Sequence, residues 1–304
     1  MSRRGWLLFV AMGVIWGLPY LLIRISVREL SPATLVFART GAAALLLLPF
    51  AIGRDAIRPL AKKWLVIVIY TVIEVGIPWF LLSTAEEHLS SSVSGLLIAS
   101  VPLIGAVVAF ATGSAHQLSL RGVAGLLFGL AGVAVLVGLN VRGSSLVGVG
   151  EILICAIGYA TGPAIISRYL SDLPPLGVVT ASFVLTALAY SPYALTHLPH
   201  HMTGEIWLSV ALLATVCTAL AFMVFFALIA EVGPVKATVI TYVNPAVAVV
   251  LGVSLLNEPF TWGIAVGFPL ILVGSFLTTR SSRIRREPDA VPLESGVLAA
   301  DGPV

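Results

Sequence analysis

Two ionisable side chains lie inside long apolar runs of this sequence. Arg39 and Glu74 are each flanked on both sides by apolar residues, and an ionisable group at the centre of a bilayer costs about 2.5–3.5 kcal/mol on insertion scales. An arginine can hold a carboxylate through two hydrogen bonds, and a glutamate can bind an amine or change its protonation state. Both residues are therefore candidates for binding a solute or a coupling ion.

Three aromatic residues are further candidates for a central cavity. Trp16 lies in the middle of an apolar run, which favours a position inside a helical bundle. Trp79 and Tyr159 are also candidates, but aromatic residues near the end of a span commonly belong to the belt at the membrane interface. Both interpretations stay open for these two residues.

The composition indicates what kind of fold must position these side chains. The chain has 304 residues, of which 59% are hydrophobic and only 10% charged, whereas soluble domains carry about 25% charged residues. A soluble fold of this composition would expose large apolar patches. The net charge of +3 is too small and too scattered for a nucleic-acid-binding protein. The two cysteines lie in apolar runs and predict no disulfide framework.

The apolar runs predict an all-α polytopic membrane protein with ten transmembrane helices. A bilayer core of about 30 Å needs about 20 apolar residues per helix. The predicted spans are 6–24, 33–53, 64–84, 88–112, 120–140, 146–168, 175–196, 206–230, 236–256 and 260–279. If the N-terminus is cytoplasmic, thirteen of the 17 Lys and Arg residues lie in inside segments and three in outside segments. The positive-inside rule then places both termini in the cytoplasm and the protein in the cell membrane.

The two halves of the chain resemble each other when one is shifted by 143 residues. Pro32, Pro49, Trp64 and Pro102 then coincide with Pro175, Pro192, Trp207 and Pro245. Prolines and tryptophans are few enough that duplication is the best explanation. We therefore predict one repeat in 1–140, a second in 141–280 and a disordered cytoplasmic tail in 281–304.

Five spans per repeat is an odd number, so the second repeat must enter the membrane from the opposite side. An inverted-topology repeat of this kind places a site near the midplane, with two conformations that alternate access. In the second repeat, the positions equivalent to Arg39 and Glu74 hold the neutral residues Ser182 and Cys217. We therefore expect a contact between the two charges, direct or through water, which either lines the cavity or is a static structural ion pair.

The repeat also singles out Tyr242 and Asn244. They occupy the positions of Ala99 and Val101, so the second half is more polar and aromatic at this point. Such a difference suits an asymmetric solute, and it equally suits hydrogen bonds between helices.

With these features the chain resembles the ten-span drug/metabolite transporter superfamily and, within it, the EamA-type permeases. The resemblance covers residues 6–279 and rests on Trp16-Gly17, on Ser31-Pro32 with Phe37-Ala38-Arg39, and on Asn244-Pro245 with Asn257-Glu258-Pro259. The first repeat departs from the pattern, because Gly113-Ser114-Ala115-His116-Gln117 lacks an acidic residue where the second repeat has Glu258. The resemblance implies a carrier of small organic metabolites, often amino acids or related compounds, and an exporter rather than an importer.

Three other classes of protein compete with this interpretation. A channel or facilitator and a lipid scramblase are compatible with the same pattern of helices. An intramembrane enzyme is disfavoured, because no HExxH, GxSxG or paired-aspartate motif lies in or beside a span. We expect no cofactor and no metal site, and the cluster His197, His200 and His201 is interpreted as a solvated loop. The expected partners are a small solute, bilayer lipid and a coupling proton, with the protein a monomer or a homodimer.

Overall fold

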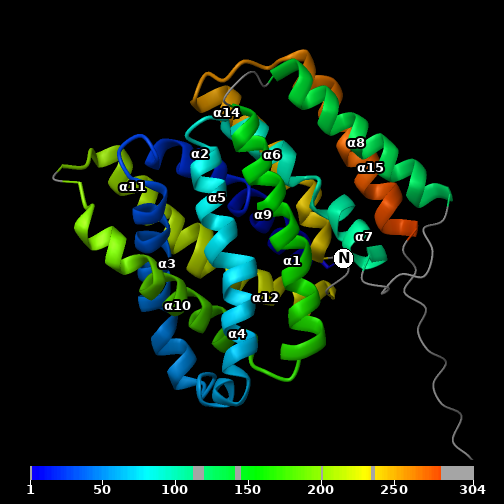
Figure 1. The fold of residues 1–304 in the computed structure, drawn as a ribbon. Coiled ribbons are helices and arrows are strands. Elements are labelled where there is room, and N and C mark those ends of the chain that lie inside the picture. Colours follow the sequence, from blue (N-terminus) through cyan, green and yellow to red (C-terminus); the bar gives the residue numbers. More distant parts are fainter. Residues whose placement is uncertain (1, 112–119, 141–144, 200, 234–236, 282–304) are drawn as a thin grey trace, which may run out of the picture.

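The computed structural model describes residues 2–111, 120–140, 145–199, 201–233 and 237–281 of the chain, and these residues form a bundle of helices without strands (Figure 1). The helices of the first half are α1 (Arg3–Ile15), α2 (Leu18–Ser26), α3 (Pro32–Gly53), η1 (Arg58–Lys63), α4 (Trp64–Tyr70), η2 (Thr71–Gly76), α5 (Ile77–Ala85), α6 (Ser91–Ile98), α7 (Val101–Ala111) and α8 (Leu120–Asn140). Those of the second half are α9 (Ser145–Ile165), η3 (Ile166–Leu170), α10 (Pro175–Thr196), α11 (Gly204–Ala214), η4 (Thr215–Leu220), α12 (Ala221–Val232), η5 (Thr238–Tyr242), α14 (Asn244–Leu255) and α15 (Trp262–Ser281).

These elements confirm the predicted polytopic helical membrane fold. Within the described residues, eight helices are long and apolar enough to cross a membrane, and two shorter apolar helices occupy the positions of the predicted ninth and tenth spans. Many apolar side chains on the outside of the bundle are exposed, including Leu45, Leu120 and Trp262, as expected for contact with lipid. The predicted tail beyond residue 281 lies outside the described residues.

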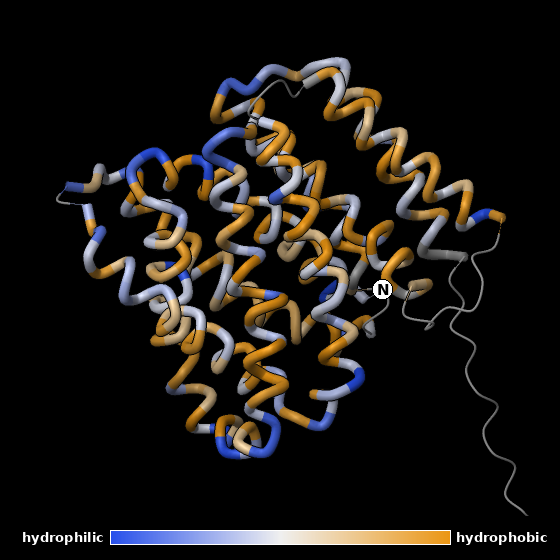
Figure 2. Tube along the Cα trace, viewed as in Figure 1, coloured by the Kyte–Doolittle hydropathy of each residue, from blue (hydrophilic) through white to orange (hydrophobic). Residues whose placement is uncertain are grey.

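Hydrophilic segments gather at two opposite ends of the bundle, with hydrophobic helices between them (Figure 2). One end carries the segments 27–31, 86–90, 197–199, 201–203 and 256–261 and is called here the Glu86 face. The other carries the segments 54–63 and 171–174 together with the start of α1 and the end of α12, and is called the Lys63 face.

Several spans are interrupted near their middle. The first span breaks at Trp16-Gly17, before Pro19, and the fourth at Ala99-Ser100, before Pro102. The ninth changes at Val243 from the 3-10 helix η5 to α14, which begins with Asn244-Pro245. A proline inside a helix removes one backbone donor and clashes with the preceding turn, so a break at these points follows from the sequence. Positions 100 and 243 are equivalent in the two halves.

Spans three and eight each contain a π-helical turn at nearly equivalent positions. Thr71–Gly76 forms η2 and Thr215–Leu220 forms η4. Pro78 provides one cause in the first half, since it has no backbone N–H to bond to the Glu74 carbonyl. The second half has Ala221 at the corresponding position, so proline is not required for η4. Single π-helical turns occur frequently at functional sites.

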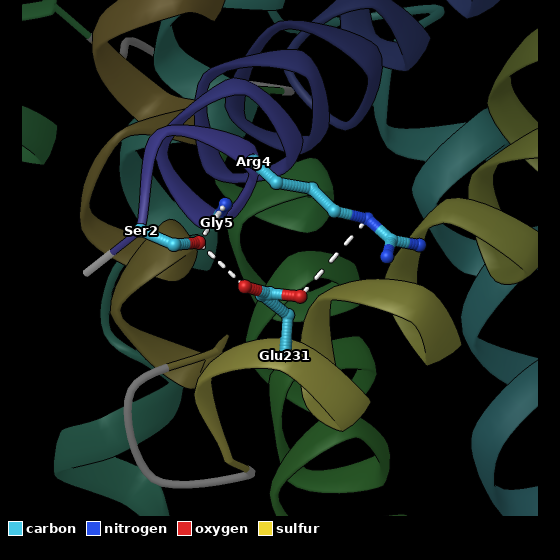
Figure 3. Close-up of polar contacts among 4 residues, drawn as sticks. All are labelled: Ser2, Arg4, Gly5 and Glu231. Atoms are coloured by element: carbon cyan, nitrogen blue, oxygen red, sulfur yellow. Dashed lines mark hydrogen bonds and ion pairs between the residues drawn. The ribbon is translucent and has the colours of Figure 1, made fainter.

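Contacts at the chain ends repeat in the two halves. Ser2 caps α1 and its hydroxyl donates to Glu231 Oε1 at 2.5 Å, while Arg4 Nε lies 4.0 Å from the other oxygen (Figure 3). The equivalent serine, Ser145, donates to the carbonyl of His88, the residue equivalent to Glu231. The start of each repeat is thus tied to the end of the third span of the other repeat, which is the arrangement expected for an inverted repeat.

A second pair of contacts links the halves on opposite faces. Glu29 accepts hydrogen bonds from the backbone N–H and hydroxyl of Thr203 on the Glu86 face. The equivalent acid, Asp172, accepts from Lys63 Nζ at 2.5 Å on the Lys63 face. This hydrogen bond from Lys63 lowers the pKa of Asp172 below its ordinary value. Glu29 and Asp172 occupy equivalent positions, and each contacts the start of the third span of the other repeat.

The helices α8 and α15 pack with their backbones in close contact. A Cβ atom at Gly132 would lie 2.7 Å from the backbone nitrogen of Ile271 and 2.8 Å from the carbonyl oxygen of Gly267. A Cβ atom at Gly274 would lie 2.4 Å from the backbone nitrogen of Gly129. Only glycine permits this approach, so the small residues of these spans serve internal packing.

The Glu86 face is tightly packed where the first span meets the fourth and ninth. A Cβ atom at Gly17 would lie 2.4 Å from Val247 Cβ, and one at Gly95 would lie 2.6 Å from Ala248 Cβ. All residues from Ser91 to Leu97 on α6 are buried. Where the sixth span meets the fourth, a Cβ atom at Gly105 would lie in ordinary contact with Ala160 Cβ, at 3.8 Å. We call this tightly packed arrangement of the Glu86 face closed.

Glu258 holds the start of α6 on this closed face. Its two carboxylate oxygens accept hydrogen bonds from the backbone N–H and hydroxyl groups of Ser91 and Ser92, at distances between 2.5 and 3.0 Å. A carboxylate at a helix N-terminus is favoured by the free N–H groups and by the helix dipole. The equivalents of Ser91 and Ser92 are Pro234 and Val235, so the first repeat lacks the acid and the second lacks the hydroxyls that would bind it.

Candidate functional site

A small cavity lies in the middle of the bundle, between the third, seventh and eighth spans. Its volume is about 30 Å³, which is room for water but not for an organic solute. The lining residues come from both halves of the chain: Tyr70, Glu74, Val75, Trp79, Val179, Ser182, Phe183 and Phe222. Carboxyl, hydroxyl and indole groups thus surround a space with aromatic walls, and two of the predicted site residues, Glu74 and Trp79, line it.

Glu74 lies in the π-helical turn η2 and packs against α9. A Cβ atom at Gly162 would lie 1.8 Å from Glu74 Oε2, so the glycine makes room for the carboxyl group. This oxygen is buried and has no hydrogen-bond partner among the described residues. A buried carboxyl group that lacks a partner is costly, which favours a role for Glu74 beyond packing.

Arg39 lies on α3 and is buried, with 7% of its surface exposed. Its Nε atom donates to Thr218 Oγ1 at 2.8 Å, and its guanidinium carbon lies 3.7 Å from the centre of the Trp79 ring. The terminal nitrogens of Arg39 have no hydrogen-bond partner in the described part of the chain. Some polar atoms of the protein are fully buried and have no hydrogen-bond partner, but the terminal nitrogens of Arg39 do not belong to this group. The end of the guanidinium therefore remains available for an anionic group.

Arg39 and Glu74 do not form a direct ion pair in the structure. Span two packs mainly against spans seven and eight and span three mainly against span six, so each charge faces the opposite half. Arg39 meets Thr218 and its neighbour Cys217, the equivalent of Glu74. Glu74 shares the cavity with Ser182, the equivalent of Arg39. We expected a contact direct or through water; the structure has no direct one, and each charge lies beside residues of the other repeat, with Trp79 next to both.

Trp16, Trp79 and Tyr159 all lie near this cavity. Trp79 is buried and its ring centre lies 5.5 Å from that of Phe183. Phe183 in turn contacts Phe222, and Phe222 contacts Trp16 with ring centres 5.9 Å apart. Tyr159 on α9 packs against the same core and lies close enough to Arg39 and Glu74 to interact electrostatically with both. Trp79 therefore belongs to the interior and not to the interface belt.

Asn244 and Tyr242 lie at the break in the ninth span. In the amide orientation that matches its neighbours, Asn244 donates to the carbonyl oxygens of Ile240 at 3.0 Å and Gly13 at 3.2 Å. Asn244 thus connects the breaks of the first and ninth spans, which supports the interhelical interpretation. Tyr242 ends η5 and is half-buried. Neither residue is part of the cavity lining, although Trp16 lies at the adjoining break.

Sequence reasoning missed Thr218, Phe183 and Phe222. Thr218 is equivalent to Val75, the residue after Glu74, so the repeat contained a signal for its position. The two phenylalanines could not be distinguished from ordinary core residues. Among the described residues, no group of three or more His, Cys, Asp or Glu side chains is placed to hold a metal ion. His197 stacks on Tyr193, and His200 lies outside the described residues.

Comparisons with known proteins agree on one family. A model of the EamA-like transporter family matches residues 3–138 and again residues 146–280. The Escherichia coli K12 protein named uncharacterized inner membrane transporter YedA is 31% identical over 264 residues, which cover 82% of this chain and 81% of the relative. A Salmonella typhimurium protein named probable amino-acid metabolite efflux pump is 23% identical over 300 residues, which cover 94% of this chain and 98% of the relative.

A solved crystal structure shares the fold at 20% sequence identity. The TM-score is 0.65, and the match covers 93% of this chain and 98% of the other. The family model accounts for both halves of the chain, and the structure has the repeated helical membrane fold that the sequence predicted. This chain belongs to the EamA-like transporter family.

Proposed function

We propose that this transporter is a secondary carrier that exports small organic metabolites, such as amino acids or related compounds, by alternating access of its two repeats. The observation that carries the proposal is the pair of opposite charges at the inter-repeat cavity. Arg39 offers unbonded guanidinium nitrogens and Glu74 a carboxyl group without a partner. A solute with an acidic and a basic group has a counterpart for each.

The size of the cavity supports alternation. A space of about 30 Å³ does not hold a metabolite, so a solute enters only when the halves move apart. The first, fourth and ninth spans close the Glu86 face through the contacts of Gly17 and Gly95, whereas Gly105 and Ala160 lie in ordinary contact. Exchange of the two arrangements between the repeats would open the Glu86 face, as inverted repeats permit.

The proposed location is the inner membrane, with both termini in the cytoplasm. The excess of Lys and Arg in the segments of the Lys63 face supports this orientation. The relative YedA is named as an inner membrane transporter, and the Salmonella relative as an efflux pump for amino-acid metabolites. The relatives' names also support a transport role rather than an enzymatic one.

Counterflow in liposomes tests the proposal. Purified protein is reconstituted with a mixture of amino acids inside, and uptake of each radiolabelled amino acid is followed with and without a pH gradient. We expect exchange by the wild type and its loss in Glu74→Gln and Arg39→Lys, since lysine keeps the charge but not the planar fork. Glu205→Gln, which changes an exposed acid, is the control.

Each outcome separates the competing functions. Exchange that survives Glu74→Gln and Arg39→Lys unchanged would make the two charges structural. Conductance events in a planar bilayer would identify a channel, and movement of labelled lipid between leaflets a scramblase. Saturable exchange without either would support the carrier, and sensitivity to the pH gradient would add proton coupling.

A further inference from the structure

Glu86 is a buried acid that the transport site does not use. It follows the last residue of α5 and is 0% exposed, although it lies in a loop on the Glu86 face. Neither of its carboxyl oxygens has a hydrogen-bond partner among the described residues. Its neighbour Glu87 is exposed, so burial of Glu86 is specific to this position and not a property of the loop.

The groups around Glu86 do not neutralise a negative charge. Arg24 on α2 donates from Nη1 to the backbone carbonyl of Glu86 and forms no ion pair with the carboxyl group. Glu258, on the segment between α14 and α15, adds a second negative charge. Tyr20 on α2 lies close enough to interact electrostatically with Glu86, whereas Glu151 on α9 interacts with His88 and Glu87.

The position at the end of α5 also disfavours a carboxylate, because the C-terminus of a helix carries partial negative charge. Burial raises the pKa of Glu86 well above its ordinary value; Arg24 opposes this rise and Glu258 adds to it. The closed structure therefore binds the proton more tightly than a hydrated form would. By linkage, acid stabilises the closed form, and this stabilisation is lost as the pH rises through the raised pKa.

Glu86 lies where the closed face would have to open. Its neighbours Arg24 and Tyr20 are on α2, which packs against α6 and α14 at the junction marked by Gly17 and Gly95. Separation of α2 from these helices would let water reach the carboxyl group. In the second half, the positions of Glu86, Arg24 and Tyr20 are Ile229, Ser167 and Pro163, so the feature belongs to one face only.

We propose that Glu86 is a proton-binding site that couples uptake of a proton at the Glu86 face to closure of that face. The inference rests on the proposed alternating-access function. It assigns to Glu86 a role distinct from that of Glu74, since Glu86 lies outside the cavity lining and on the far side of the closed junction. In the orientation proposed above, acid outside the cell holds the outer face closed.

Double electron–electron resonance, which measures the distance between two spin labels, tests this role on the purified full chain. Spin labels are attached to cysteines at Arg28, beyond the end of α2, and Leu255, the exposed last residue of α14, with Cys155 and Cys217 replaced by alanine. We expect a short distance in acid and a growing long-distance population as the pH rises. One linked proton predicts a change of up to about tenfold per pH unit in the ratio of the two populations.

Three variants identify the group that titrates. Glu86→Gln is a permanently neutral mimic, so the short distance should persist at all pH values. Glu87→Gln alters the exposed neighbour and should titrate like the parent protein. Arg24→Gln removes the charge that favours the carboxylate, so the pH-dependent range should extend upward, and this variant tests the site even if Glu86→Gln does not fold.

The proposal is overturned if the parent protein shows no pH-dependent distance, or if Glu86→Gln titrates as the parent does. Counterflow on the wild-type protein, which keeps Cys217 beside Arg39, keeps the two proposals apart. Active exchange without a pH-dependent distance rejects only the proton site. Absence of exchange together with one fixed distance at every pH rejects the carrier as well.

Discussion

The orientation of Arg39 depends on a single hydroxyl group. Thr218 lies in the π-helical turn η4, and its Oγ1 atom donates to the carbonyl of Leu213 at 2.7 Å while accepting from Arg39 Nε. Trp79 supports the flat side of the guanidinium. The hydroxyl belongs to the second repeat and the arginine to the first, so Thr218 fixes the direction in which the free end of Arg39 points.

Thr218→Val should weaken solute binding without unfolding the protein. A hydrogen bond to a charged group contributes about 1.5–3 kcal/mol, so we expect the half-saturation concentration for exchange to rise by about tenfold or more. Thr218→Ser keeps the hydroxyl group and should restore the half-saturation concentration of the wild type. Thr71→Val removes a comparable inter-repeat bond, from Thr71 to Ser182 at 2.9 Å, and should leave the anion end of the site intact. Equal effects of Thr218→Val and Thr71→Val would show that the loss is only structural.

Of the seven residues singled out from the sequence, Tyr242 and Asn244 lie outside the cavity lining. Arg39, Glu74, Trp16, Trp79 and Tyr159 were found from charge, aromaticity and depth, and all five lie around or next to the cavity. The partners were not predictable from these signals. They depend on how the spans of one half pack against those of the other, which the residues of one half alone do not encode.

At the scale of the elements, prolines and glycines account for most of the geometry. Pro102 and Pro245 mark the irregularities in the fourth and ninth spans. The π-helical turn η4 was not predictable in the same way, since no proline accompanies it. Its wide turn lets the Thr218 hydroxyl reach the carbonyl five residues earlier, and the tertiary contact with Arg39 supports this geometry.

The glycines of α8 allow a direct prediction about how α8 packs against α15. Gly132→Ala would place its Cβ atom 2.7 Å from a backbone nitrogen of α15, which cannot move without shifting the helix, whereas Gly138 has nothing within 4 Å. Overpacking costs about 1–3 kcal/mol, so we expect Gly132→Ala to lower the thermal unfolding midpoint in detergent. Gly138→Ala should leave it unchanged or raise it slightly, because alanine favours the helix. A similar fall of the unfolding midpoint in both variants would mean that the packing of α8 against α15 does not depend on close backbone contact.

At the scale of the whole molecule, the two repeats are built alike but packed differently. Equivalent contacts recur at Ser2 and Ser145 and at Glu29 and Asp172. The junctions that would open are unequal, since Gly17 meets Val247 closely while Ala160, equivalent to Gly17, lies in ordinary contact with the position of Gly105. The equivalent positions Gly17 and Ala160 are therefore packed differently in the two halves.

Gly17→Ala should therefore act as a wedge that keeps the Glu86 face from closing. The added Cβ atom would lie 2.4 Å from Val247 Cβ and 3.1 Å from the carbonyl oxygen of Asn244, distances that closure cannot accommodate. We expect the distance between spin labels at Arg28 and Leu255 to lengthen and exchange to slow severely. Ala160→Gly, at the equivalent position, should change neither quantity.

A second substitution distinguishes a wedge from misfolding. Because the obstructing atom of Val247 is its Cβ, only Val247→Gly removes it, and the double variant should regain the short distance and much of the exchange. Glycine inside α14 itself costs about 0.5–1 kcal/mol, so Val247→Gly alone gives the reference for that loss. If the double variant stays open, or if Gly17→Ala closes normally, the first and ninth spans are not the moving junction, and opening must occur between other helices.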